Sequence, residues 1–358
     1  MLLQHLQDPE FVRLSLPFLG YFGVLVPALV VCMRSSAGHL VANRSKSLPT
    51  LLGILLLTIA TLSLTGTWFY IITWIVGDAQ TYLESHPGTA ITAWMKNCDL
   101  FTGAYVLVTE TSENWWWSVK LLNFVPSMVV FMWAASSGSS TTNRVSIPAA
   151  GFLILGMLGA ISVCWPLFLI QHVSQGKGCR LEGGRASFLL SICMALSVLS
   201  NVVQPYLAPG SVGFDFNLKA IHVLLLAPLL FKGANKSGKT STSDPDSIRL
   251  LLVFLAGCSF VSFSTLTLDQ LHAQTFDLAR TLSNLQAAFF SNACQSSITL
   301  DYFSATTTSV VFMLYEVMAG EGGKKLGVWG KVCMSGLALL APVLSTGVVF
   351  PLFLALIG

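Results

Sequence analysis

Nine long runs of apolar residues constrain the fold of this chain more than any other feature of its sequence. The runs cover residues 16–33, 51–76, 121–135, 147–170, 187–207, 218–231, 250–268, 302–318 and 332–357. A helix needs about 20 mostly apolar residues to cross a hydrocarbon layer of about 30 Å. The runs 121–135 and 218–231 are short, so the pattern predicts an all-α, polytopic transmembrane helical bundle with eight or nine spans. Pro342 and Pro351 predict that the last run is a kinked span or a broken pair.

The composition agrees with a membrane protein and excludes other classes. Of 358 residues, 54% are hydrophobic and only 10% are charged, whereas soluble domains carry about 25% charged residues. The formal net charge of +3 gives no reason to expect a nucleic-acid partner. We therefore expect residues 1–358 to form a single integral-membrane helical domain, surrounded by membrane lipids.

The distribution of lysine and arginine predicts which way the chain faces. With nine spans, 13 of the 19 basic residues fall in the N-terminal segment and the even-numbered connections. Because cytoplasmic connections are enriched in Lys and Arg, this count predicts a cytoplasmic N-terminus. The first connection argues the opposite way, since Arg34, Arg44 and Lys46 lie in it or at its edge.

One motif matches a nucleotide-binding pattern by its letters alone. The sequence Gly233-Ala-Asn-Lys-Ser-Gly-Lys-Thr240 fits the phosphate-binding loop, which requires a buried strand before it and a helix after it. Here a predicted membrane helix precedes the motif, and Pro245 follows where a helix should continue. We interpret 232–249 as a solvated basic loop. The eight cysteines include no Cys-x-x-Cys pair and the histidines stand singly, so neither a metal nor a cofactor is expected.

Acidic residues are rare, and three of them lie close together before the third apolar run. If residues 91–120 form one helix, Asp99, Glu110 and Glu113 share a face, because 11 residues make almost three turns. The Trp115-Trp116-Trp117 sequence that follows is typical of an aromatic belt at a membrane interface. We therefore expect residues 78–120 to form an interfacial acidic and aromatic segment. A solvated carboxylate face paired with Lys120, and tryptophans that act only as anchors, are the alternatives.

Two more carboxylates belong to the eighth apolar run. Glu316 lies within it, where an ionisable group is costly and must be paired, near the end of the span, or functional. Asp301 lies 15 residues earlier, about 22 Å away along a helix, so the two cannot form one dyad. Asn201 and His222 are polar groups in apolar runs, and hydrogen bonds between helices explain them adequately.

Two stretches resemble a known family. They are Asp99-Leu-Phe-Thr followed by Glu110-Thr-Ser-Glu-Asn-Trp-Trp-Trp-Ser118, and Ala220-Ile-His-Val-Leu-Leu-Leu-Ala-Pro-Leu-Leu230. Both resemble the integral-membrane terpene cyclases of fungal meroterpenoid pathways, of the ascochlorin and ascofuranone type. The general layout is similar over most of the chain, but these stretches cover less than a fifth of it.

The resemblance implies cyclisation of a farnesyl chain on a phenolic or related ring, often as a terminal epoxide supplied by an upstream flavin epoxidase. Such a reaction needs a Brønsted acid, a dry apolar chamber and a final base, and it needs no metal when it starts by protonation. A multi-pass location in the endoplasmic reticulum is implied. The carboxyls that could serve as acid or base are Glu110, Glu113, Asp99, Glu316 and Asp301. The candidate substrate-binding residues are Trp115, Trp116, Trp117, Tyr302, Tyr315, Asn201 and His222.

Two other functions remain open. A proton- or cation-coupled transporter would use Glu316 and Asp301 to carry the ion. A lipid- or sterol-binding membrane protein would hold a ligand in the same chamber without chemistry.

Overall fold

The computed structural model describes residues 9–42, 47–137, 147–176, 179, 187–227, 229 and 245–358. Over these residues the chain is helical and contains no β-strand. The helices are α2 (Pro9–Ala42), α3 (Ser47–Ser85), α4 (Ile91–Asn97), α5 (Leu100–Val108), α6 (Ser112–Ser137), α7 (Ile147–Leu158), α8 (Ile161–Ser174), α9 (Ser187–Val203), η1 (Gln204–Tyr206), α10 (Val212–Leu226), α12 (Pro245–Ala273), α13 (Leu278–Phe289), α14 (Ala293–Met318), α15 (Glu321–Lys324), α16 (Val328–Leu339), α17 (Ala341–Leu344) and α18 (Thr346–Ile357).

Five of these helices are long and apolar enough to cross a membrane. They are Phe18–Ala42, Leu48–Ser85, Ser112–Ala135, Leu189–Tyr206 and Asp246–Ala273. Helix α14 is long enough but more polar, and Ile161–Ser174, Val328–Leu339 and Thr346–Ile357 are apolar but short. The all-α class is therefore confirmed for the described residues, whereas the count of eight or nine spans is not.

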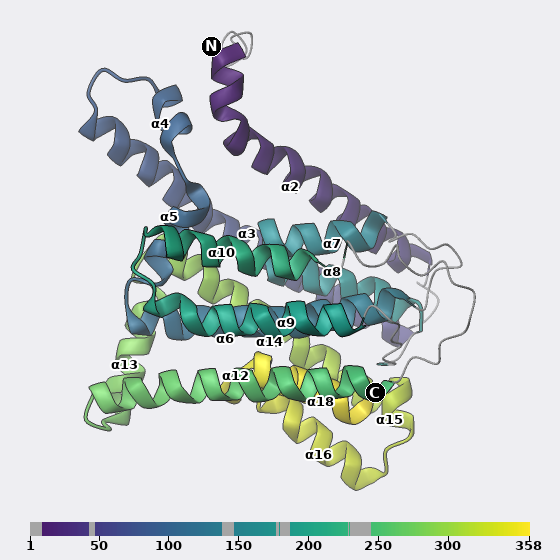
Figure 1. The fold of residues 1–358 in the computed structure, drawn as a ribbon. Helices are drawn as coiled ribbons and strands as arrows, with labels where there is room; N and C mark the ends of the chain where they lie inside the picture. Colours follow the sequence, from purple (N-terminus) through teal and green to yellow (C-terminus); the bar gives the residue numbers. More distant parts are fainter. Residues whose placement is uncertain are drawn as a thin grey trace.

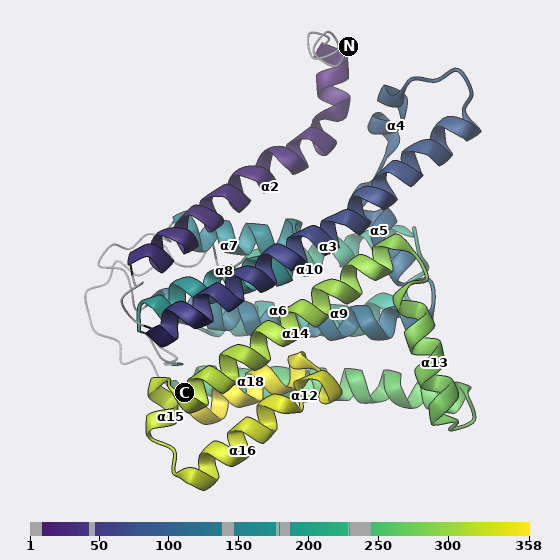
Figure 2. The same ribbon diagram turned by 180° about the vertical axis from the view of Figure 1, so that it is seen from behind.

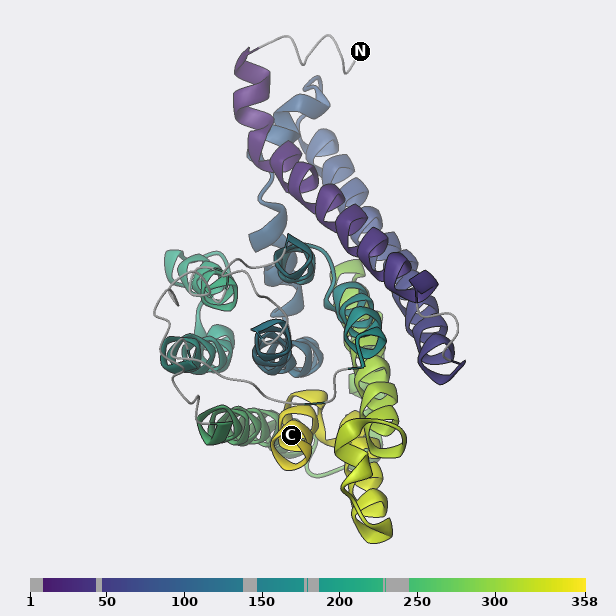
Figure 3. The ribbon, with the colours of Figure 1, turned by 90° about the vertical axis from the view of Figure 1, so that its right-hand side faces the viewer.

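Helix α6 lies at the centre of the bundle. Its most apolar stretch is 94% buried, against 17% for the corresponding stretch of α2. Helices α9, α12, α14 and α18 pack around α6, whereas α2 and α3 cross one side of the bundle at a tilt (Figures 1, 2 and 3). One hydrophobic cluster runs from Leu25 on α2 to Ile357 on α18. The exposed faces of α2 and α3 are rich in apolar residues, as expected of helices that face lipid.

The apolar run 147–170 forms two helices where the sequence predicted one span. Helix α7 ends at Leu158 and α8 begins at Ile161, so the chain breaks inside the bundle. Gly159 makes the break possible, because a Cβ there would lie 2.8 Å from Leu155 O and 2.7 Å from Leu25 Cδ1. The two short helices lie against each other and against α2, and α8 returns to the end of the bundle where α7 begins (Figures 1 and 2).

Other predicted spans are also rearranged. The short run 121–135 is part of the longer α6, which begins at Ser112 and contains Pro126. The run 218–231 is described only in part, and α10 starts before it at Val212. The last run forms two helices and not one kinked span, which agrees with the second of its two predicted forms. Helix α16 is separated from α18 by the short α17 and by Ser345, whose φ is 80°.

Residues 91–120 do not form the single helix on which the shared acidic face depends. The chain forms α4, α5 and α6 there, with breaks at Cys98–Asp99 and at Thr109–Thr111. Asp99 starts α5, because its side chain accepts a hydrogen bond from Thr102 N. Since the chain leaves the helix at Thr109–Thr111, Asp99, Glu110 and Glu113 do not share a helical face. The predicted loop 232–249 and the motif 233–240 lie outside the described residues, apart from the start of α12.

Candidate functional site

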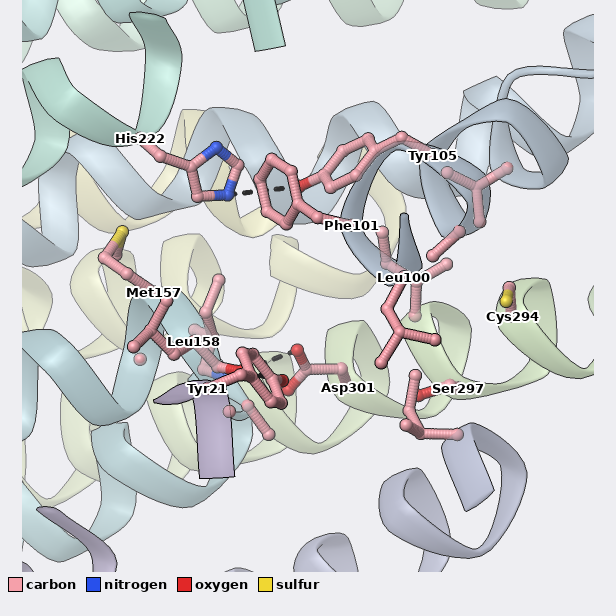
Figure 4. A pocket seen from close by; sticks show the side chains of 18 of the residues that line it. Tyr21, Leu100, Phe101, Tyr105, Met157, Leu158, His222, Cys294, Ser297 and Asp301 are labelled. Carbon is pink, nitrogen blue, oxygen red and sulfur yellow. Dashed lines mark hydrogen bonds between the residues drawn. The ribbon is translucent and has the colours of Figure 1, made fainter. Parts of the chain in front are cut away.

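A largely apolar cavity of ≈ 520 Å³ lies between α2, α3, α5, α10 and the α7–α8 break, with α6 and α14 as its further walls. This volume is within the range of about 300–1,000 Å³ that small-molecule sites occupy. Apolar and aromatic side chains such as Trp74, Phe101 and Met157 form most of its surface. A few polar groups converge on it, and Figure 4 shows the principal ones at its two walls. This combination of an apolar chamber and few polar groups makes the cavity the candidate functional site.

Asp301, on α14, lies at the deep wall of the cavity and is only 9% exposed. Its Oδ1 accepts a hydrogen bond of 2.6 Å from Ser162 N, and its Oδ2 accepts a longer one of 3.3 Å from Ile161 N. These amides are the first two of α8, and the N-cap residue Ala160 offers no side-chain acceptor of its own. Asp301 therefore caps α8 from another helix, and the helix dipole favours negative charge at this position.

The other side of the break is also held by a cavity residue. Tyr21, on α2, donates a hydrogen bond from its hydroxyl to Leu158 O, the last carbonyl of α7. Figure 4 shows Tyr21, Leu158 and Asp301 together at the deep end of the cavity. Because the carbonyls at the end of a helix lack partners within it, this bond satisfies a group that would otherwise be unpaired in an apolar region. Residues of α2 and α14 therefore hold the C-terminal end of α7 and the N-terminal end of α8, respectively.

His222 and Tyr105 form a polar pair on the opposite wall (Figure 4). His222 Nδ1 lies 2.9 Å from Leu218 O, one turn earlier on α10. Since a carbonyl only accepts, Nδ1 carries a hydrogen, and Nε2 is left with its lone pair. Nε2 lies 3.5 Å from Tyr105 Oη, a distance long enough for a ligand atom to compete with that bond. Phe101 packs edge-on against the imidazole, with ring centroids 4.6 Å apart.

Two charged residues that line the cavity, Asp99 at the start of α5 and Lys219 in the second turn of α10, are exposed. We call this exposed part of the lining the mouth of the cavity. Lys219 Nζ lies 2.6 Å from Asp215 Oδ2, and Thr102 donates to Asp215 Oδ1 at 2.8 Å. The bond from Lys219, followed by the bond from Thr102, holds the pKa of Asp215 below its usual value. The site therefore has a polar mouth and a largely apolar interior.

Two of the predicted acids lie away from the cavity. Glu110 is exposed in the turn between α5 and α6. Glu113 lies in the first turn of α6, where its Oε2 accepts a hydrogen bond of 3.1 Å from Ser112 Oγ. Neither residue lines the cavity. The prediction that these carboxylates join Asp99 in one acidic face is corrected by the helix break at Thr109–Thr111, which separates α5 from α6.

Three of the aromatic residues predicted to bind substrate instead surround the side chain of Lys120. Lys120 is 2% exposed, and its Nζ lies 3.9 Å from the ring centre of Trp116, 5.2 Å from Trp117 and 4.9 Å from Tyr302. Phe263, at 5.3 Å, completes this cage. Trp116 and Trp117 bond through their indole N–H groups to α12 and α13, and Trp115 is buried. The tryptophans therefore pack inside the bundle, contrary to the predicted belt, and none lines the cavity.

The last three candidate residues, Glu316, Asn201 and Tyr315, lie outside the cavity and contact other parts of the bundle. Glu316 is 1% exposed and lies beside Cys179 and the Gly320 turn, where a Cβ would come within 2.3 Å of its Oε2. Asn201 donates to Asn123 Oδ1 at 3.4 Å, which confirms the alternative of a hydrogen bond between helices. Tyr315 is half-buried on α14. None of the three lines the cavity.

The structure thus brings together Asp99, His222 and Asp301 of the predicted residues, and it adds Tyr21 and Tyr105. The sequence offered no signal for Tyr21, since a tyrosine in an apolar run is also a common interfacial anchor. Within the part of the chain that the structure describes, no group of three or more His, Cys, Asp and Glu residues is arranged to hold a metal ion. No family model matches the chain, and neither the curated proteins nor the solved structures include a significant match.

Proposed function

We propose that this protein is a membrane terpene cyclase that folds a prenyl chain in the cavity and cyclises it by proton transfer. The observation that carries the proposal is a buried carboxyl, Asp301, at the deep end of a largely apolar chamber. The substrate is a lipophilic prenylated molecule, such as a farnesylated phenol with or without a terminal epoxide. The aromatic faces of Trp74, Phe101 and Tyr105 supply π surfaces for a travelling carbocation.

In the proposed reaction Asp301 is the acid. Its Oδ1 is held firmly by Ser162 N, whereas the bond from Ile161 N to Oδ2 is long, so Oδ2 is the oxygen that carries the proton. Donation of this proton to the epoxide oxygen, or to the alkene, leaves a carboxylate at the N-terminus of α8, where the helix dipole stabilises it. The positive charge then moves along the chain as each new carbon–carbon bond forms.

His222 is the base in this proposal. With its Nδ1 hydrogen bonded to Leu218 O, its Nε2 lone pair is directed toward Tyr105 and the cavity. Nε2 takes the proton from the carbon next to the final cation, and a double bond forms there. Return of one proton from His222 to Asp301 through solvent restores the starting state. The net reaction is an isomerisation, so its atoms balance without a further reactant.

The test uses yeast microsomes that express the full chain, supplied with farnesylated phenols with and without a terminal epoxide. A product of unchanged mass and new retention time is expected. The variant Asp301→Asn should abolish this product, because the amide cannot donate a proton of comparable acidity, whereas Glu113→Gln, outside the cavity, should keep wild-type turnover. Loss of turnover in Glu113→Gln with full turnover in Asp301→Asn would reject the assignment.

A transporter is the second candidate, and one observation favours it. Half-helix ends that meet at a binding site are frequent in secondary transporters. The end of α7 and the start of α8 meet beside Asp301 in a similar way, although this pair returns to the side from which it enters. However, Asp301 is already bonded by amide N–H groups at the positive end of α8, which disfavours a cation there. Ion-dependent uptake into proteoliposomes without any cyclised product would support transport. Ligand binding without product or uptake would indicate a lipid- or sterol-binding protein.

A further inference from the structure

The α7–α8 pair changes which connections lie on the same side of the membrane. Followed by colour in Figures 1 and 2, α2, α6 and α14 end at one end of the bundle, α10 runs toward it, and α3, α9 and α12 begin there. Helices α7 and α8 enter from this end and return to it. The run 147–170 therefore does not cross the bundle, and each connection after it changes side relative to the nine-span prediction.

Of the described basic residues, five belong to helices at this end, which we call the basic end: Arg34, Arg249, Lys324, Lys325 and Lys331. Nine more belong, by sequence alone, to stretches between helices that end or begin here and lie outside the described residues: Arg44, Lys46, Arg144, Lys177, Arg180, Arg185, Lys232, Lys236 and Lys239. In the nine-span prediction, the basic residues of the first connection argued for the opposite orientation. This conflict disappears, because the α2–α3 connection is now on the same side as the other basic connections.

The opposite end of the bundle, which we call the acidic end, is rich in carboxylates. Among the described residues it holds nine carboxylates: Glu10, Asp78, Glu84, Asp99, Glu110, Glu113, Asp215, Asp269 and Asp277. It also exposes aromatic side chains, among them Tyr206, Phe216, Phe276 and Phe290. Amphipathic α13 lies across the bundle at this end (Figures 1 and 2). Exposed aromatic rings and a transverse helix are typical of a surface that rests in the lipid headgroup region.

The mouth of the cavity belongs to the acidic end. Asp99 starts α5 there, and Lys219 lies in the second turn of α10. Cys294 and Ser297, near the start of α14, line the cavity on the way to Asp301. The seven residues from Cys294 to Asp301 correspond to about 10 Å of helix. The cavity thus leads from the acidic end into the bundle.

We propose that the basic end is cytoplasmic and that the cavity is loaded from the opposite, non-cytoplasmic leaflet. The ligand is an amphiphile whose polar head stays between Asp99 and Lys219 while its apolar chain extends toward Asp301. Lys and Arg are retained on the cytoplasmic side during insertion, which gives the direction. The identity of the ligand rests on the proposed function, but the orientation does not.

The orientation is tested with two cysteine sites in sealed yeast microsomes, whose cytoplasmic face is outward. Cys333 is exposed on α16 near the basic end, and Thr89→Cys introduces a thiol into the exposed α3–α4 connection at the acidic end. A membrane-impermeant maleimide should label Cys333 in intact vesicles and Thr89→Cys only after detergent is added. The variant Cys333→Ser, as a matched control, assigns the first signal. The reverse order of labelling would overturn the proposal.

Loading is tested at Cys98, which lines the mouth beside Asp99. Burial, followed by the charge of Asp78, raises the pKa of this thiol, so the labelling is done at alkaline pH in permeabilised membranes. A farnesylated phenol should slow the labelling of Cys98 several-fold and leave Cys333 unaffected; Cys98→Ser identifies the signal. Equal labelling with and without the phenol would overturn the loading route. Since neither readout needs turnover, a failure here is distinguishable from a lack of cyclase activity.

Discussion

Ser162 N donates a hydrogen bond of 2.6 Å to Asp301 Oδ1, across 139 residues of sequence. This bond joins α14 to the first turn of α8 at the point where the apolar run 147–170 breaks. A helix N-terminus inside an apolar bundle leaves amide groups without partners unless a side chain accepts from them. Asp301 therefore has a structural role in addition to its proposed chemical one, and variants must separate the two.

The first prediction separates these roles. Asp301→Asn keeps a carbonyl oxygen for Ser162 N, so we expect most of the thermal stability in detergent to remain. Asp301→Ala leaves that amide unsatisfied, and a buried unsatisfied group costs about 1–3 kcal/mol. Turnover should fall by about 10²–10⁴-fold in both variants, the usual contribution of a positioned acid. Equal destabilisation by Asn and Ala would show that the hydrogen bond is not what holds α8.

A second prediction concerns the turn between α7 and α8. A methyl group on Gly159 would lie 2.8 Å from Leu155 O, a backbone atom that cannot move without distorting α7. Gly159→Ala should therefore lower the melting temperature and impair any ligand binding in the cavity. Gly257→Ala is the matched control, because Gly257 is exposed on α12 with nothing within 4 Å of an added Cβ. There the alanine should be neutral or stabilising, by up to about 1 kcal/mol.

The α7–α8 break shows where prediction from the sequence stops. Residues 147–170 have the length and hydropathy of one span, and Pro166 inside α8 suggests a kink no more strongly than Gly159 suggests a turn. What decides the break is a cap supplied by Asp301 and Tyr21, from helices more than 130 residues away. Such a contact leaves no local pattern. The all-α class was predictable because it depends only on the length of the apolar runs.

Two residues of the candidate site were also predictable from the apolar runs. Asp301 and His222 stand out as polar residues in or beside apolar runs, where a polar group needs a partner or a function. The shared face of Asp99 and Glu113 failed because the helix that Asp99 caps ends at Val108, and a new helix at Ser112 changes the phase. The position of Lys120 beside the tryptophans was accessible, since Trp116 and Trp117 precede it by four and three residues on one helix.

The third prediction tests the Lys120 cage. Among the described residues no carboxylate forms an ion pair with Lys120, and aromatic rings surround its Nζ, so the rings are what stabilise the ammonium group. A desolvated cation–π contact gives about 2 kcal/mol, whereas a lysine at membrane depth costs about 2.5–3.5 kcal/mol. These values nearly cancel. Lys120→Met should therefore change stability by no more than about 1 kcal/mol, in the stabilising direction, and leave turnover intact.

The control for this variant is Trp116→Ala, which removes a large buried side chain and should cost about 3–5 kcal/mol. Both proteins are compared by thermal denaturation in the same detergent. A loss of stability in Lys120→Met as large as that of Trp116→Ala would show that the charged group is required, which the aromatic cage alone does not explain.

A fourth prediction follows from the lowered pKa of Asp215. A carboxyl whose folded pKa is below its unfolded value stabilises the fold above the unfolded pKa, and this stability is lost as the pH falls through the folded pKa. Wild type should therefore be more stable than Asp215→Asn at neutral pH, and the difference should shrink below the ordinary pKa of 3.8. Melting temperatures between pH 7 and pH 3 measure this. Exposed Asp246→Asn, in the same titration, shows the response of a carboxyl at the other end of the bundle.

The last prediction distinguishes the acid from the base. His222→Phe keeps an aromatic ring against Phe101 and removes Nε2, the group proposed to end the cascade. Because Asp301 can still start the reaction, substrate consumption should continue, but the final cation should lose its proton at several carbons and give a mixture of double-bond isomers. Asp301→Asn should instead stop consumption. Chromatography with mass detection resolves the two outcomes. A single wild-type product from His222→Phe would remove His222 from the mechanism and leave Asp301 as both acid and base.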